Sequence, residues 1–99
     1  MKRLVEELAG YSVATGTTVT AVLDARPFEL DPGPVDVHFA YPGRDAADDA
    51  IVEMIERHPD PSSLVVATSD KALVERVRAL GADTISAGSL QRMLDERAR

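Results

Sequence analysis

Apolar residues recur along this chain at two spacings, and each spacing predicts a type of secondary structure. Intervals of three and four residues predict four amphipathic helices. They run from about Lys2 to Ala14, from Ala47 to Ile55 with an end before Pro59, from Leu73 to Leu80, and around Leu90 to Leu94. Apolar or alternating runs predict strands over residues 18–24, 35–40 and 64–68, with a weaker one over 83–87.

Strands that alternate with helices predict an α/β fold. We expect three layers, with a mostly parallel sheet of about four strands flanked by helices. The sequence shows no internal repeat or linker, so it predicts a single domain over residues 1–99. The link from Asp24 to Val35 contains no helix, although parallel crossovers usually do. In folds of this class, ligands bind beyond the carboxyl ends of the strands.

Glycines mark the predicted ends of two helices. The first helix should close near Gly16, and Gly81 sits where a left-handed C-terminal cap is expected after the third.

Composition and charge limit where this protein works and what it contacts. Apolar residues make up 44% and charged residues 28% of the chain, which is a globular balance. The chain has no cysteine, so disulfides and thiolate metal sites are excluded. No segment resembles a membrane span or a signal peptide, and a cytoplasmic protein is expected. The net charge of −6 restricts any contact with RNA to a local one, without a broad basic surface.

Aspartates stand at the points where the predicted strands end. Asp24 follows the apolar run "AVL", and Asp70 follows "VVATS". Asp45, Asp48 and Asp49 lie between the second strand and the second helix. If the strands are parallel, these carboxylates converge, and their mutual repulsion favours a shared Mg²⁺ or Mn²⁺. Such an ion can activate water for attack on a phosphodiester.

Basic residues follow each acidic position closely. Arg26, Arg44 and Lys71 are placed to hold a nucleic-acid backbone next to the carboxylates. We assign these three residues and Ser69 to substrate binding.

Each acidic position also has a structural interpretation. The acids that open the second helix are stabilised by its dipole, and Asp70 or Ser69 would be a good N-cap for the third. Asp24 can simply begin a turn. Two histidines, His38 and His58, are interpreted as structural rather than metal-binding. Only the joint placement of the acids at the expected ligand edge favours a functional site.

Three segments resemble a known family. "VTAVLDARPFE", "VDVHFAYPGRDAADDAIVEMI" and "LVVATSDKALVERVRALGADTISAGSLQRML" are similar to the NYN domain of the YacP-like group, within the PIN-like metal-dependent ribonucleases. The resemblance runs from about Lys2 to Leu94, and its most specific part is the apolar strand closed by Thr-Ser-Asp. It implies RNA cleavage with Mg²⁺ or Mn²⁺. Matched residue by residue, it implies four metal ligands, Asp24, Asp48, Asp49 and Asp70, of which the last three are also catalytic.

The first strand that is usual in this family, with its Asp-Gly-x-Asn type motif, has no counterpart in this sequence. We expect either a piece of a longer nuclease or a reduced member of the family. The strands that end at Asp24 and Thr68 would flank the absent one. Their edges would then be unpaired, which favours a homodimer; the alternative is direct pairing of these two strands within one chain.

Three functions are compatible with these observations. The leading one is a divalent-metal-dependent RNA endonuclease of weak activity. The second is a non-catalytic domain that keeps the fold and binds protein or RNA. The third is a phosphatase-like α/β enzyme, which shares the acids but lacks a nucleophile motif. Fold analogy alone does not decide among them.

Overall fold

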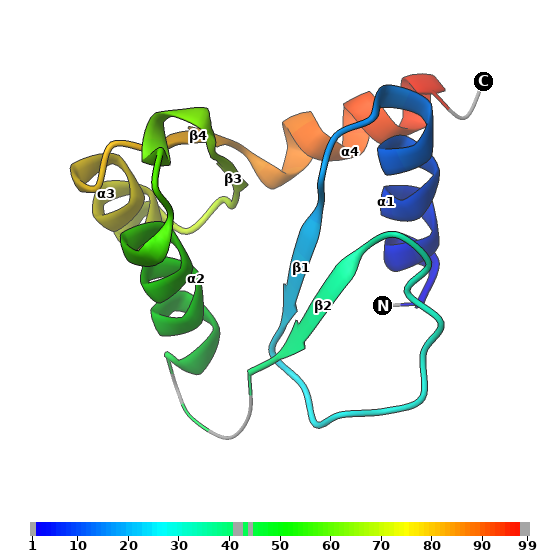
Figure 1. The fold of residues 1–99 in the computed structure, drawn as a ribbon, viewed down its shortest axis with the longest axis horizontal. Coiled ribbons are helices and arrows are strands. Elements are labelled where there is room, and N and C mark those ends of the chain that lie inside the picture. Colours follow the sequence, from blue (N-terminus) through cyan, green and yellow to red (C-terminus); the bar gives the residue numbers. More distant parts are fainter. Residues whose placement is uncertain (1, 41–42, 44, 98–99) are drawn as a thin grey trace. The chain divides into compact units, whose positions relative to one another are not determined.

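A computed structural model describes residues 2–40, 43 and 45–97 of the chain. Its elements, in order, are α1 (Lys2–Thr15), β1 (Thr20–Leu23), β2 (Asp36–Phe39), α2 (Ala46–Arg57), the 3₁₀ turn η1 (Pro61–Ser63), β3 (Val65–Ala67), α3 (Lys71–Ala79), β4 (Asp83–Ile85) and α4 (Ala87–Arg97), as Figure 1 shows. Strands alternate with helices from β2 onward, and both pairs of strands are parallel. The prediction of an α/β fold is confirmed.

The chain forms two compact units, Met1–Ala47 and Asp48–Arg99. Units of this size are small for an independent hydrophobic core. The single domain over residues 1–99 therefore stays a prediction.

The first unit is built on the parallel pair β1 and β2. Thr20 is opposite Asp36 and Leu23 is opposite Phe39, and Ala40 N–H extends the ladder to the Leu23 carbonyl at 2.8 Å. Exposed positions alternate with half-buried ones along β2, as the sequence pattern indicates. The interior side chains are Val5, Leu8, Ala21, Leu23 and Val35. They come from α1, from β1 and from the residue before β2, so the apolar side of α1 packs against this sheet.

The connection between these strands, residues 24–35, contains no helix, as predicted. Gly33 has a φ of +55°, and a Cβ on it would lie 3.7 Å from the Cβ of Ala9 in α1. The Gly33 N–H also donates to Asp31 Oδ1 at 3.1 Å. The loop thus turns next to α1 at Gly33, whose positive φ favours glycine.

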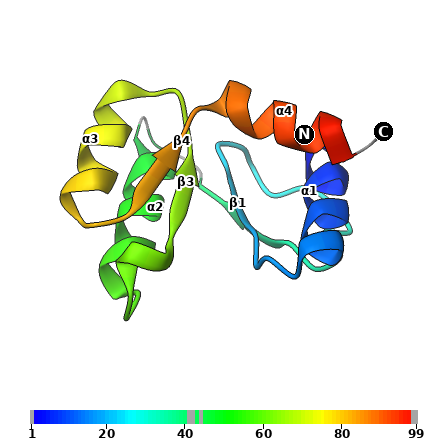
Figure 2. The ribbon, with the colours of Figure 1, turned by 90° about the horizontal axis from the view of Figure 1, so that it is seen from above.

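The second unit packs α2 and α3 against the parallel pair β3 and β4. Both helices lie on the same side of this pair (Figures 1 and 2). Its core consists of Ile55 from α2, Leu73 and Val77 from α3, and Ala82 before β4. The spacing of Leu73 and Val77, four residues apart, puts both on one helix face. The apolar stripe that predicted α3 is therefore the face that builds this core.

Glycine ends two helices as expected. Gly16 follows α1 with a φ of +72°, and its N–H donates to the Ser12 carbonyl at 2.9 Å. Gly81 follows α3 with a φ of +93°, and its N–H donates to the Arg78 carbonyl at 3.0 Å. Residues with a Cβ rarely adopt these angles, so both caps depend on glycine.

Two details differ from the sequence-based expectations. The apolar spacing in the last helix predicts that Leu90, Met93 and Leu94 all face inward, but in α4 Leu94 is buried, Leu90 half-buried and Met93 37% exposed. The described strands also form two sheets of two strands each, β1 with β2 and β3 with β4, rather than one sheet of four. Among the described residues, β1 pairs only with β2 and β3 only with β4. Each of these two strands is consequently paired along one edge.

The core of the second unit predicts a specific cost of truncation. Ile55 is 2% exposed, so Ile55→Ala should lower the free energy of unfolding by about 2–5 kcal/mol. Val65, which is 58% exposed on β3, provides the control. Val65→Ala should cost less than about 1 kcal/mol. Urea unfolding of both variants measures the difference, and equal losses would contradict the proposed location of the core.

Candidate functional site

Asp70 caps the N-terminus of α3. Its backbone is extended, with φ −79° and ψ 114°, and its Oδ1 accepts hydrogen bonds from the N–H groups of Ala72 at 2.9 Å and Leu73 at 3.1 Å. Thr68 Oγ1 in turn accepts the Asp70 N–H at 3.1 Å. These bonds satisfy donors that the first turn of a helix leaves unpaired. The structural interpretation of Asp70 is therefore correct.

The cap occupies only half of the Asp70 carboxylate. Both bonds end on Oδ1, and within residues 2–40, 43 and 45–97 no group is seen to hydrogen-bond Oδ2. Asp70 is also exposed. Two bonds to one oxygen restrict the rotation of the carboxylate and leave Oδ2 able to accept a further bond. Capping and ligand binding are therefore compatible at this residue.

The acids of α2 lie in its first turn, as predicted. Asp48 is half-buried and Asp49 exposed. Asp49 Oδ1 receives a hydrogen bond from Arg76 Nη2 of α3 at 3.1 Å. The two side chains are 66% and 45% exposed, and such exposed ion pairs contribute at most about 1 kcal/mol. The pair links α2 to α3, but it is weak enough for Asp49 to exchange Arg76 for another partner.

Arg76 was not identified by sequence reasoning. It lies 27 positions from Asp49, and the pair forms because the core brings α2 and α3 together. No local spacing rule connects residues on different helices, so the sequence carries no signal for this contact.

The predicted substrate-binding residues lie in different surroundings. Lys71 is exposed at the first residue of α3, next to the positive end of the helix dipole, where a cation is unfavourable. Ser69 Oγ accepts the Ala87 N–H at 3.1 Å and so ties the end of β3 to the start of α4. Arg26 is exposed in the loop after β1. Arg44 lies outside the described residues.

The predicted metal ligands do not form a complete group in this structure. Their carboxylate oxygens are the ligand type that Mg²⁺ and Mn²⁺ prefer. However, the described part of the chain contains no group of three or more Asp, Glu or His side chains that could hold an ion. Asp24 belongs to the first unit and is exposed, whereas Asp48, Asp49 and Asp70 belong to the second. The four-ligand set stays a prediction.

The two histidines have structural contacts. His38 Nε2 lies 3.3 Å from Asp36 Oδ2 on the exposed side of β2, and His58 Nδ1 accepts the Asp60 N–H at 3.0 Å. Both contacts join residues two positions apart. The interpretation of these histidines as structural agrees with this geometry.

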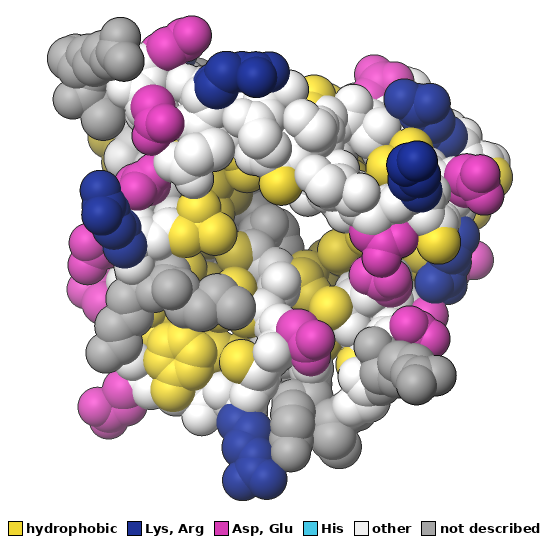
Figure 3. All heavy atoms as spheres, turned by 180° about the vertical axis from the view of Figure 1, so that it is seen from behind, with side chains coloured by type: hydrophobic (Ala, Val, Ile, Leu, Met, Phe, Trp, Pro, Cys, Tyr) yellow, Lys and Arg dark blue, Asp and Glu magenta, His cyan; other side chains and the backbone are white. Residues whose placement is uncertain are grey.

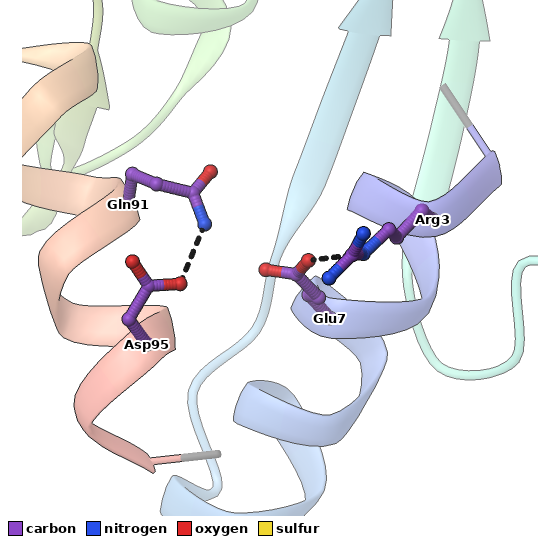
Figure 4. Close-up of polar contacts among 4 residues, drawn as sticks. All are labelled: Arg3, Glu7, Gln91 and Asp95. Carbon is purple, nitrogen blue, oxygen red and sulfur yellow. Dashed lines mark hydrogen bonds and ion pairs between the residues drawn. The ribbon is translucent and has the colours of Figure 1, made fainter. Parts of the chain in front are cut away.

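Charged side chains of both signs lie on the face in Figure 3. Basic side chains stand singly among acidic ones on the face in Figure 3. Several charges are used within single helices: Arg3 pairs with Glu7 at 3.4 Å in α1, and Gln91 bonds Asp95 at 3.0 Å in α4 (Figure 4). Among the helices described, none combines the length and apolar character needed to cross a membrane.

The cap predicts that the stability of α3 depends on the hydrogen-bonding oxygen at position 70 and much less on its negative charge. Asparagine caps helices as well as aspartate does, so Asp70→Asn should change stability by only a few tenths of a kcal/mol, whereas Asp70→Ala should lose about 1 kcal/mol. For a chain of this size, that loss lowers Tm by roughly 4–8 °C. Thermal unfolding of the two variants tests this. Equal destabilisation of both would show that the Oδ1 hydrogen bonds are not the reason for the cap.

Comparison with known proteins places this arrangement in a family. The structure of this chain is similar to the crystal structure of Rae1 (YacP) from Bacillus subtilis, with a TM-score of 0.79 and 25% sequence identity over 96% of this chain and 57% of that one. The chain thus spans little more than half the length of the protein it matches. A comparison with curated proteins gives no match. The family model of the YacP-like NYN domain matches residues 2–99, and the chain belongs to this family.

Proposed function

We propose that the chain takes part in divalent-metal-dependent cleavage of RNA. The observation that carries this proposal is Asp70, an exposed residue that follows β3, of which only one carboxylate oxygen is used by the cap of α3. Ligands of open α/β sheets bind at this end of the strands. Membership of the YacP-like NYN family supports a nuclease-family domain.

The choice of aspartate at position 70 supports the proposal further. A cap needs only a short polar side chain, and serine or asparagine would serve as well. A negative charge is useful for a second task, binding a cation. Lys71, next in the chain, is unfavourable for the helix but suited to a phosphate. The charge of Lys71 is thus one that α3 does not require, whereas the charge of Asp70 also suits the positive end of the helix dipole.

In this proposal the acids act together and the bases hold the RNA. Asp48, Asp49 and Asp70 are the catalytic carboxylates, and with Asp24 they are the metal ligands. Because the Asp49–Arg76 pair is exposed and weak, Asp49 can exchange it for another cation at little cost. Arg26, Arg44, Ser69 and Lys71 contact the substrate.

The second candidate function is a domain that binds protein or RNA without catalysis. It is favoured by the absence of a three-carboxylate group among the described side chains. The two functions differ in one respect that can be measured. A binding domain leaves RNA intact under every metal condition.

Cleavage of RNA should depend on metal and on Asp70. With Mn²⁺, the protein should cut an end-labelled single-stranded RNA slowly, and excess EDTA should stop the reaction. Asp70→Asn keeps the cap but removes the charge, so it should lower the rate by about tenfold to 100-fold. Asp83→Asn, an exposed acid at the start of β4, is the matched control and should retain the rate. Equal cutting in EDTA, or by the Asp70→Asn protein, would refute the proposal.

Self-association through strand edges also stays a prediction. β1 and β3 each pair along one edge among the described strands, and Val65 on β3 is 58% exposed. A lysine on an edge strand opposes pairing, so Val65→Lys should shift a homodimer towards monomer. Val13→Lys, at a 76% exposed position on α1, should not. Sedimentation equilibrium decides: a concentration-independent mass of one 10.6 kDa chain for the unmodified protein would exclude the dimer.

A further inference from the structure

A groove of about 320 Å³ lies within the second unit, along α3 and β4, which run side by side in Figure 2. It is lined by Thr68, Ser69, Val74, Arg78, Thr84, Ile85 and Ser86. Thr68 and Ser69 follow β3, and Ser86 follows β4, so one end of the groove is at the carboxyl ends of both strands. Its volume is at the small end of the range for ligand sites. It begins one residue from Asp70.

The lining has an unusual charge for this protein. The chain carries 17 acidic residues and a net charge of −6, yet none of the described residues that line the groove has a carboxylate. Among the described lining residues, Arg78 in the last turn of α3 is the charged one. In the described part of the chain, Arg78 forms no ion pair or side-chain hydrogen bond, unlike Arg76, which pairs with Asp49. An unpaired guanidinium in a groove without carboxylates favours an anionic ligand.

The hydroxyl groups at the strand ends add hydrogen-bond donors. Thr68 Oγ1 accepts the Asp70 N–H, and Ser69 Oγ accepts the Ala87 N–H, each at 3.1 Å. A hydroxyl that accepts a bond still has its own proton to donate. Ser86 differs, because its hydroxyl bonds Ser89 Oγ at 3.0 Å. Thr68 and Ser69 therefore present two O–H donors at the end of the groove nearest Asp70.

Val74 and Ile85 supply the apolar part of the wall. A ligand that fits this combination has an anionic group for the guanidinium, acceptor oxygens for the hydroxyls and an apolar flat or ring surface for the aliphatic side chains. A nucleotide has all three features: phosphate, ribose oxygens and base. An acidic peptide supplies the charge but not the ring surface, so a nucleotide fits the lining better.

We propose that this groove binds one nucleotide of a single-stranded RNA, with its phosphate on Arg78. This inference rests on the proposed function, since it extends the substrate path from Asp70 along α3. Arg78 is a binding residue here and takes no part in bond cleavage. The acidic remainder of the surface keeps the contact local.

Binding is measured without metal, in EDTA, by fluorescence anisotropy of a labelled single-stranded RNA hexamer. Arg78→Gln should weaken binding about tenfold, the effect of removing one charge-assisted hydrogen bond. Because one phosphate is no longer neutralised, the slope of log K against log salt concentration should also become shallower by about 0.7. Arg57→Gln is the matched control, since it removes the same charge from an arginine that pairs with Glu53 outside the groove. It should change affinity less than twofold.

A second variant guards against an effect on folding. Arg78→Lys keeps the charge at the end of α3 but loses the two-pronged guanidinium, so its affinity should fall between those of the wild type and Arg78→Gln. Amide signals of Thr68, Ser69 and Thr84 should shift on titration with adenosine monophosphate, and less with inorganic phosphate, which lacks the ring. Signals that shift elsewhere would overturn the assignment of the groove.

The outcomes separate this inference from the proposed function. If RNA is bound through Arg78 but never cut, the groove is supported and the nuclease proposal fails. If cutting depends on Asp70 while Arg78→Gln and Arg57→Gln bind RNA equally well, the groove proposal fails and the nuclease proposal stands. No RNA binding by the unmodified protein, or tighter binding of an acidic peptide, would also overturn the groove.

Discussion

The two hydrogen bonds from Ala72 and Leu73 to Asp70 Oδ1 determine where α3 begins. Because successive residues of a helix are rotated by about 100°, side chains four positions apart share one face of α3. In the present phase, Leu73 and Val77 enter the core of the second unit. The same phase directs Arg76 to Asp49 and puts Val74 and Arg78 along the groove. The helix that this cap begins therefore contributes to the core, the ion pair and the groove.

The structural and functional interpretations of Asp70 do not compete. A cap uses one carboxylate oxygen, and the hydrogen bonds that form it also restrict the rotation of the side chain. A carboxylate fixed in this way loses less conformational entropy when its second oxygen binds a cation or donor. The cap itself contributes only about 1 kcal/mol to stability. Its larger consequence is that it orients the Asp70 carboxylate. In the Thr-Ser-Asp segment, Asp70 can therefore cap α3 with one oxygen and accept a ligand with the other.

Local chemistry made most of the elements predictable. The apolar spacing of α1 and α3 and the β-branched run of β1 indicated their type, and the φ values at Gly16 and Gly81 agree with the caps expected of glycine. The capping role of Asp70 was among the alternatives that the sequence left open. The short turn η1 was missed, because three residues that begin with a proline give no periodic pattern. What local rules could not show were contacts set by packing: the Asp49–Arg76 pair, the groove, and the division of four strands into two sheets.

In the proposed function, Asp70 offers its second carboxylate oxygen to a cation while it caps α3. Paramagnetic broadening of backbone amide signals by Mn²⁺ tests this most directly, because the effect is strongest next to the bound ion. At the lowest Mn²⁺ concentrations, signals from Thr68 to Ala72 should broaden first in the unmodified protein. In Asp70→Asn, which keeps the cap, they should remain sharp, and in Asp83→Asn they should broaden as before. Broadening that begins elsewhere, or that is the same in Asp70→Asn, would contradict the claim.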